Sequence, residues 1–65
     1  MTTKAELQYQ ITELKMDYIN LQGDVEKMES LGHSDSVEKA VIRLENMEKR
    51  LAELNKQLLE LELQR

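Results

Sequence analysis

The apolar residues in the first half of the chain recur at alternating steps of four and three. They are Leu7, Ile11, Leu14, Tyr18, Leu21, Val25 and Met28. This spacing places them on one side of an α-helix and is the heptad pattern of helices that pack along a seam. Thr3 is followed three residues later by Glu6, the T-x-x-E pattern of a helix-starting capping box. The pattern predicts a helix over about residues 3–31.

The second half repeats the pattern after an interruption. Its apolar positions are Val37, Ala40, Leu44, Met47, Leu51, Leu54, Leu58 and Leu61. Gly32 can adopt the left-handed conformation that ends a helix, and Asp35 with Glu38 forms an acidic version of the capping box. These signals predict a turn at about residues 32–35 and a second helix over about 36–64.

The two heptad patterns also indicate how the helices pair. In an antiparallel hairpin, residues at one level have position numbers with a constant sum, and here a sum of 65 aligns every seam position. The expected pairs are Met28 with Val37, Val25 with Ala40, Leu21 with Leu44, Tyr18 with Met47, Leu14 with Leu51, Ile11 with Leu54 and Leu7 with Leu58. A last layer sets the Lys4 stem on Leu61. The fold class is therefore predicted as all-α: one antiparallel two-helix coiled-coil hairpin over residues 1–65.

Side chains that flank the seam agree with this pairing. Asp17 with Arg50, Asp24 with Arg43 and Gln10 with Gln57 meet along one edge, and Lys15 with Glu48 and Gln8 with Asn55 along the other. No like charges oppose each other, which favours this register over alternatives. The same contacts would form between two chains that exchanged helices, so the sequence leaves a domain-swapped form open.

Three further expectations come from the composition. A hairpin of 65 residues buries little surface, so we expect self-association, with two hairpins forming a four-helix bundle. The net charge of −4 and the lack of a basic face argue against direct nucleic-acid binding. The absence of cysteine, of a signal-like N-terminus and of a membrane span predicts a cytoplasmic protein that does not act at membranes.

A second track of small and apolar residues lies on the first helix, away from the seam. It consists of Ala5, Tyr9, Thr12, Met16, Ile19 and Gly23, again at steps of four and three. A glycine inside a helix costs about 1 kcal/mol relative to alanine, so Gly23 suggests a close backbone approach. The residues predicted to bind a partner are Tyr9, Met16, Ile19, Gly23, Leu59 and Leu63. The leading hypothesis is a protein–protein interaction or structural module that docks helix to helix, on itself or on another helical protein.

The sequence gives little support for catalysis or for metal and cofactor binding. His33, Ser34 and Asp35 have the residue types of a hydrolase triad, but consecutive residues in one turn cannot form the required relay. Glu29 and His33 could supply only two metal ligands. We therefore predict a non-enzymatic protein with no catalytic, cofactor-binding or metal-binding residues.

The alternative function is that of an acidic regulator. Five glutamates gather towards the open end of the hairpin: Glu6, Glu13, Glu53, Glu60 and Glu62. Such a patch could sequester a basic or nucleic-acid-binding protein through Glu13, Glu53 and Glu60. This hypothesis predicts binding that weakens steeply with salt, whereas apolar docking does not.

Overall fold

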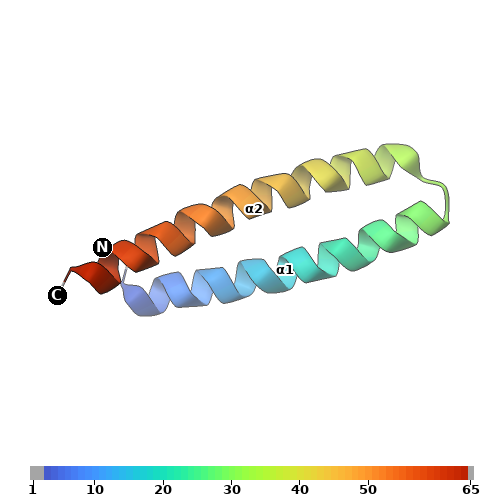
Figure 1. Ribbon diagram of the computed structural model, residues 1–65. Coiled ribbons are helices and arrows are strands. Elements are labelled where there is room, and N and C mark those ends of the chain that lie inside the picture. The colour runs from blue at the N-terminus through green and yellow to red at the C-terminus, as the bar shows by residue number, and fades with distance from the viewer. Residues whose placement is uncertain (1–2, 65) are drawn as a thin grey trace.

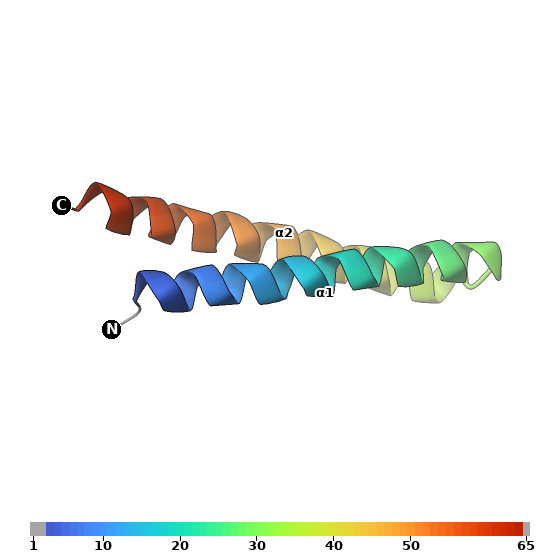
Figure 2. The same cartoon turned by 90° about the horizontal axis from the view of Figure 1, so that it is seen from below.

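The computed structural model describes residues 3–64, which form two helices joined by a short turn. Helix α1 spans Lys4–Ser30 and helix α2 spans Ser34–Leu63. The chain runs outward along α1 and returns along α2, so that α1 begins where α2 ends (Figure 1). The helices lie side by side in both views and cross at a shallow angle (Figure 2). The result is a rod with extents of 51 × 16 × 15 Å.

The two predicted seams form the core. One cluster, near the open end, is built from Leu7, Ile11 and Leu54 with Leu14, Leu51 and Leu58 packed against it. A second cluster, near the turn, is built from Leu21, Val25 and Ala40 with Met28, Val37, Leu44 and Met47. Each cluster contains residues that the constant sum of 65 places at neighbouring levels. The predicted packing of α1 on α2 is therefore confirmed.

Tyr18 lies between the two clusters and behaves differently from the other seam residues. It is only partly buried, and its hydroxyl donates a hydrogen bond to Oε1 of Glu48 at 2.5 Å. The phenol therefore turns to the edge of the seam, because its oxygen requires a polar partner. Lys15, the predicted partner of Glu48, makes no ion pair with it. The two clusters thus meet at a polar contact instead of a continuous apolar layer.

The hydrogen bond to the Glu48 carboxylate raises the pKa of Tyr18 above its ordinary value of 10.0, and desolvation and the negative charge of Glu48 add to the effect. A raised folded-state pKa means that the bond contributes stability fully below the unfolded pKa and loses it as the pH rises through the folded pKa. We expect the stability difference between the native chain and Tyr18→Phe to be constant from neutral pH to about pH 9 and to shrink above about pH 10.

The measurement is a tyrosinate absorbance titration in a Tyr9→Phe background, which leaves Tyr18 as the only tyrosine. Glu48→Gln should lower the titration midpoint of Tyr18. A midpoint that is identical with and without the Glu48 carboxylate would contradict the hydrogen bond.

The predicted ion pairs along the two edges are not formed. Within residues 3–64 the one ion pair joins Nζ of Lys4 to Oε1 of Glu62, at 3.6 Å. The Lys4 ammonium therefore reaches to α2, while its predicted seam partner Leu61 stays 36% exposed. Exposed ion pairs contribute only about 0–1 kcal/mol, so solvated side chains are not held at the distance of an ion pair.

At the start of α1, the threonine half of the predicted capping box is formed. The Thr3 hydroxyl oxygen accepts a hydrogen bond from the backbone N–H of Glu6 at 3.1 Å. The first helical backbone bond follows, from the N–H of Leu7 to the carbonyl of Thr3 at 3.0 Å. This cap satisfies one of the free N–H groups at the helix start.

The turn closes by a Schellman motif centred on Gly32. The N–H of Gly32 donates to the carbonyl of Glu29 at 3.1 Å, and the N–H of His33 donates to the carbonyl of Met28 at 3.0 Å. Gly32 has a φ of +77°, as its predicted left-handed conformation requires. The glycine therefore ends α1 and reverses the chain.

The predicted start of the second helix was wrong by two residues. Helix α2 begins at Ser34, so Asp35 lies in its first turn and does not cap it. His33 occupies the cap position without a side-chain hydrogen bond. The Schellman motif already reverses the chain by His33, and the N–H of Val37 bonds to the His33 carbonyl at 3.1 Å. Asp35 still favours the helix through its charge near the positive end of the helix dipole.

Candidate interaction surface

Helix α1 carries an exposed apolar face in addition to its buried seam. We call this face the α1 stripe, and it consists of Ala5, Tyr9, Thr12, Met16, Ile19 and Gly23. Its three large side chains are mostly exposed, at 66% for Tyr9, 57% for Met16 and 65% for Ile19. Four seam residues of the same helix, Leu7, Ile11, Leu21 and Val25, are at most 9% exposed, and the other three are partly buried. The heptad spacing is the same on both faces, and only one of them has a partner within this chain.

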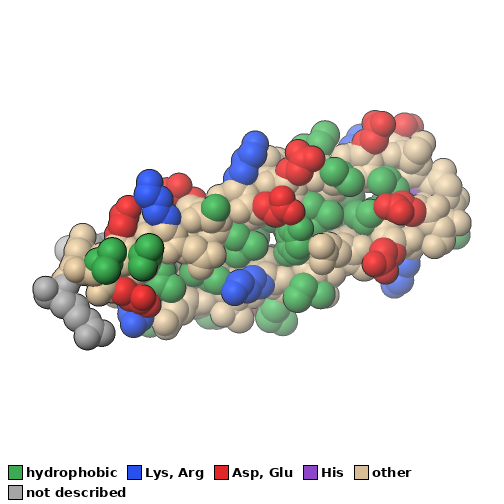
Figure 3. Space-filling view, in the orientation of Figure 1, with side chains coloured by type: hydrophobic (Ala, Val, Ile, Leu, Met, Phe, Trp, Pro, Cys, Tyr) green, Lys and Arg blue, Asp and Glu red, His purple; other side chains and the backbone are tan. Residues whose placement is uncertain are grey.

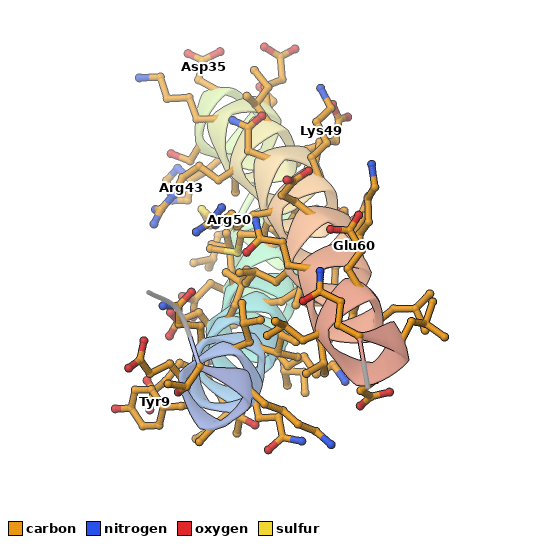
Figure 4. All side chains as sticks on the ribbon, turned by 90° about the vertical axis from the view of Figure 1, so that its left-hand side faces the viewer. Tyr9, Asp35, Arg43, Lys49, Arg50 and Glu60 are labelled. Carbon is orange, nitrogen blue, oxygen red and sulfur yellow. The ribbon has the colours of Figure 1, made fainter. Side chains whose placement is uncertain are left out.

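The α1 stripe points away from α2. At 100° per residue, its centre lies about 150° around the helix from the centre of the seam. Figure 4 shows the labelled Tyr9 side chain directed away from α2, in agreement with this geometry. A helix docked on the stripe would therefore contact α1 on the side opposite to α2.

Hydrophobic side chains are visible on the surface as well as between the helices. Figure 3 shows them along the seam, at the outer edge of α1 near its middle and at the final turns of α2. The most exposed large hydrophobic residues of α2 are Ile42 at 58%, Leu59 at 54% and Leu63 at 75%. Lys49 and Lys56 separate Ile42 from the other two. The structure thus places Leu59 and Leu63 on the outside of α2 and does not bring them together with the α1 stripe.

Packing within this chain does not explain why residue 23 is a glycine. A Cβ atom built on Gly23 would meet no atom within 4 Å. The expected close approach of a backbone is therefore absent from the hairpin itself, and the space above Gly23 is open. The partly buried state of the residue reflects its own helix.

Two hydroxyl groups on this side of α1 find their hydrogen-bond acceptors within α1 itself. The hydroxyl of Thr12 donates to the carbonyl of Gln8 at 3.0 Å, and the hydroxyl of Ser30 donates to the carbonyl of Glu26 at 3.0 Å. A hydroxyl with an internal acceptor can be covered without losing a hydrogen bond. The Thr12 methyl group is therefore compatible with an apolar contact.

Two further exposed residues were not among those predicted from the sequence. Leu31 is 71% exposed at the cap of α1, and Val41 is 38% exposed on α2. Both occupy positions that flank the seam, which the heptad pattern assigns to polar residues. An apolar residue at a position where the heptad pattern expects a polar one was the sequence feature that could have identified Leu31 and Val41.

The polar turn contains the residues considered for chemistry. Glu29, Gly32, His33, Ser34, Val37 and Glu38 line an open groove of about 320 Å³ beside the turn. His33 and Ser34 are exposed, and Asp35 points outward at the start of α2 (Figure 4). Within residues 3–64, no three side chains of His, Cys, Asp or Glu are grouped so that they could hold a metal ion.

The acidic residues at the open end are partly matched by polar neighbours. Glu62 pairs with Lys4, and the carboxylate of Glu53 accepts a hydrogen bond from Gln57 at 3.4 Å. Glu60 lines a small groove with Leu7, Gln57, Leu61 and Gln64. Glu13 lines a different groove, together with Tyr9, Gln10, Leu14, Asp17, Arg50 and Leu54.

Neither described helix combines the length and the apolar character needed to cross a bilayer. Comparison with protein-family models, with curated proteins and with solved structures gives no significant match to this chain.

Proposed function

We propose that this protein is a non-enzymatic interaction module that docks onto another helix through the α1 stripe. The observation that carries the proposal is the second heptad track, whose residues Tyr9, Met16 and Ile19 stay exposed while the first track is buried. Scattered apolar residues are common on protein surfaces. A regular run at steps of four and three along five turns is what a helix–helix contact uses.

The small core supports the same proposal. Within residues 3–64 the buried hydrophobic residues are Leu7, Ile11, Leu21, Val25, Ala40 and Leu54. A two-helix unit covers only one side of each helix, and additional burial against a partner would stabilise it. Docking on the α1 stripe supplies that burial. A cytoplasmic location and dimerisation into a four-helix bundle stay predictions.

Two acidic substitutions on the stripe should abolish docking. In Met16→Glu/Ile19→Glu, two charges lie where a partner helix would exclude water, and burying an unpaired charge is costly. We expect a loss of affinity of about thirtyfold or more, because each of the two charges opposes contact by roughly 1–3 kcal/mol. The matched control is Asn46→Glu/Asn55→Glu, which adds the same charge at exposed positions of α2.

Two measurements test this. Light scattering gives the solution mass of the native chain and both variants over a range of concentrations. Affinity capture from the native host compares the proteins held by each variant. If the stripe variant matches the native chain in both mass and captured proteins, the proposed docking is wrong.

The acidic regulator is the alternative proposal. It would use Glu13, Glu53 and Glu60, and its binding would weaken strongly with salt. The ion pair of Lys4 with Glu62 reduces the charge available at the open end. Salt-insensitive docking that is lost in the stripe variant would favour the α1 stripe over the acidic residues.

A further inference from the structure

We propose that the partner of the α1 stripe is the α1 stripe of a second copy of this chain, packed antiparallel about a twofold axis. This inference rests on the proposed function and adds the identity and register of the partner.

The register follows from the spacing of the stripe. In an antiparallel pair of identical helices, facing residues have position numbers with a constant sum. A sum of 28 pairs all six stripe residues with one another, whereas a sum of 35 pairs Thr12 with Gly23 and Met16 with Ile19 and sets Ala5 and Tyr9 opposite Ser30 and Glu26. A sum of 28 pairs residues 5 to 23 and leaves the last turns of α1 uncovered. A sum of 35 pairs residues 5 to 30, which covers almost all of α1, Lys4–Ser30. The second register buries more of the helix.

Charges beside the stripe select between the two registers. With a sum of 28, Glu13 and Lys15 each face their own counterparts in the second copy, and like charges repel. With a sum of 35, Glu6 faces Lys27 of the second copy. The twofold symmetry repeats this pair at the other end of the interface. The remaining flanking pairs are Glu13 with Asn20, Lys15 with Gln22 and Gln8 with Glu29. No like charges meet, so the register with the sum of 35 is electrostatically complementary.

The contacts in this register fit the side chains that α1 presents. At the centre of the interface, Met16 of each copy faces Ile19 of the other. Thr12 faces Gly23, where the open space at the glycine can receive the threonine side chain. The Thr12 hydroxyl keeps its bond to the Gln8 carbonyl. This layer therefore leaves no hydroxyl without a partner.

The outer layers contain the polar positions. Ser30 faces Ala5 of the second copy, with the Ser30 hydroxyl already bonded to the Glu26 carbonyl. Tyr9 faces Glu26, and a phenol can donate to a carboxylate as Tyr18 does to Glu48 inside the hairpin. A tyrosine opposite a glutamate is thus a contact that this chain already makes.

The position of the stripe also determines the shape of the dimer. Since the stripe lies about 150° from the seam, the four helices would form a nearly flat row. The two α1 helices occupy the middle and the two α2 helices the outside. In this arrangement Leu59 and Leu63 of α2, which were predicted from the sequence to bind a partner, do not contact the second copy.

A charge-swap experiment tests the partner and the register together. Glu6→Lys alone, or Lys27→Glu alone, places two like-charge pairs in the dimer, and each should raise the dimer dissociation constant about tenfold at low salt. A mixture of the two variants should form heterodimers, because both facing pairs are then attractive. The doubly exchanged variant Glu6→Lys/Lys27→Glu should regain the native dissociation constant. Analytical ultracentrifugation measures the dissociation constant of each single variant, of their mixture and of the double variant.

The double variant also removes an ambiguity about folding. Both substitutions oppose the helix dipole and can weaken α1, so a purely structural effect would be largest in the double variant. Recovery of the dimer in that variant therefore requires the facing pairs. Circular dichroism of each dilute variant measures the cost to the hairpin separately.

Crosslinking reads the register directly, since the chain has no cysteine of its own. Met16→Cys mixed with Ile19→Cys should give a heterologous disulfide under mild oxidation, because facing positions in a packed helix pair approach disulfide distance. Tyr9→Cys mixed with Ile19→Cys should give little product. The reverse result would overturn the register.

The outcomes separate this inference from the proposed function. A native chain that stays monomeric at every concentration, yet loses captured proteins in Met16→Glu/Ile19→Glu, overturns the second copy as partner and leaves stripe docking standing. A dimer that is insensitive to Met16→Glu/Ile19→Glu overturns the second copy as the partner of the stripe, and it refutes stripe docking as well if the captured proteins are also unchanged.

Discussion

Leu54→Ala is expected to unfold most of the hairpin. Leu54 is 2% exposed and joins Leu7 and Ile11 in the core cluster near the open end. Removing a buried leucine side chain costs about 2–5 kcal/mol, because the transfer free energy is lost and a cavity remains. A hairpin with so small a core has little stability to lose. Urea denaturation followed by circular dichroism measures the change in the free energy of unfolding.

Leu59→Ala is the matched control for that substitution. It removes the same atoms from the same helix, but Leu59 is 54% exposed. Its effect should be within about 0.5 kcal/mol, as for other surface substitutions. The comparison belongs at a concentration at which the native chain is monomeric. Equal effects at the two positions would show that the seam between α1 and α2 is not the core.

Gly32→Ala is expected to destabilise the hairpin by about 1–2 kcal/mol. Gly32 has a φ of +77°, and an L-amino acid with a Cβ atom is strained in that conformation. The space around the missing Cβ is open, so the cost comes from the backbone alone. Thermal unfolding of the dilute chain should show a lower midpoint.

Gly23→Ala tests the same substitution in a different backbone conformation. Gly23 lies inside α1, where a Cβ would meet nothing within 4 Å, and alanine should stabilise the isolated hairpin by about 1 kcal/mol. The two glycines should therefore respond with opposite signs. If Gly23→Ala destabilises the dilute hairpin, the helical conformation at that position is wrong.

The fold could be predicted closely from the sequence because the seam repeats one spacing without a break. Leu7, Leu14 and Leu54 were predicted at positions that proved to form one cluster. The turn was predicted from Gly32, since few residues other than glycine adopt its conformation readily. The start of α2 was missed by two residues, because Asp35 looked like a cap and the Schellman motif had already reversed the chain.

The contacts at the edges of the seam were predicted poorly. Glu48 was expected to face Lys15 and instead accepts a hydrogen bond from Tyr18. Lys4 was expected to lie on Leu61 and pairs with Glu62. Exposed long side chains have many rotamers of similar free energy, and each contact is worth about 1 kcal/mol or less. The pattern of charges in the sequence therefore shows which side chains can meet, but it does not determine which of these contacts form.

By itself, the amino-acid sequence determined the helices, the turn between them and the faces that join. These features depend on the heptad period and on one glycine, both of which act through local backbone geometry and large differences in apolar burial. Only the tertiary structure decided which polar groups meet along the edges of the seam, as the hydrogen bond from Tyr18 to Glu48 and the pair of Lys4 with Glu62 show. Tyr9, Met16 and Ile19 have the same spacing as the seam, and α2 can cover only one side of α1. Their exposure follows from that packing.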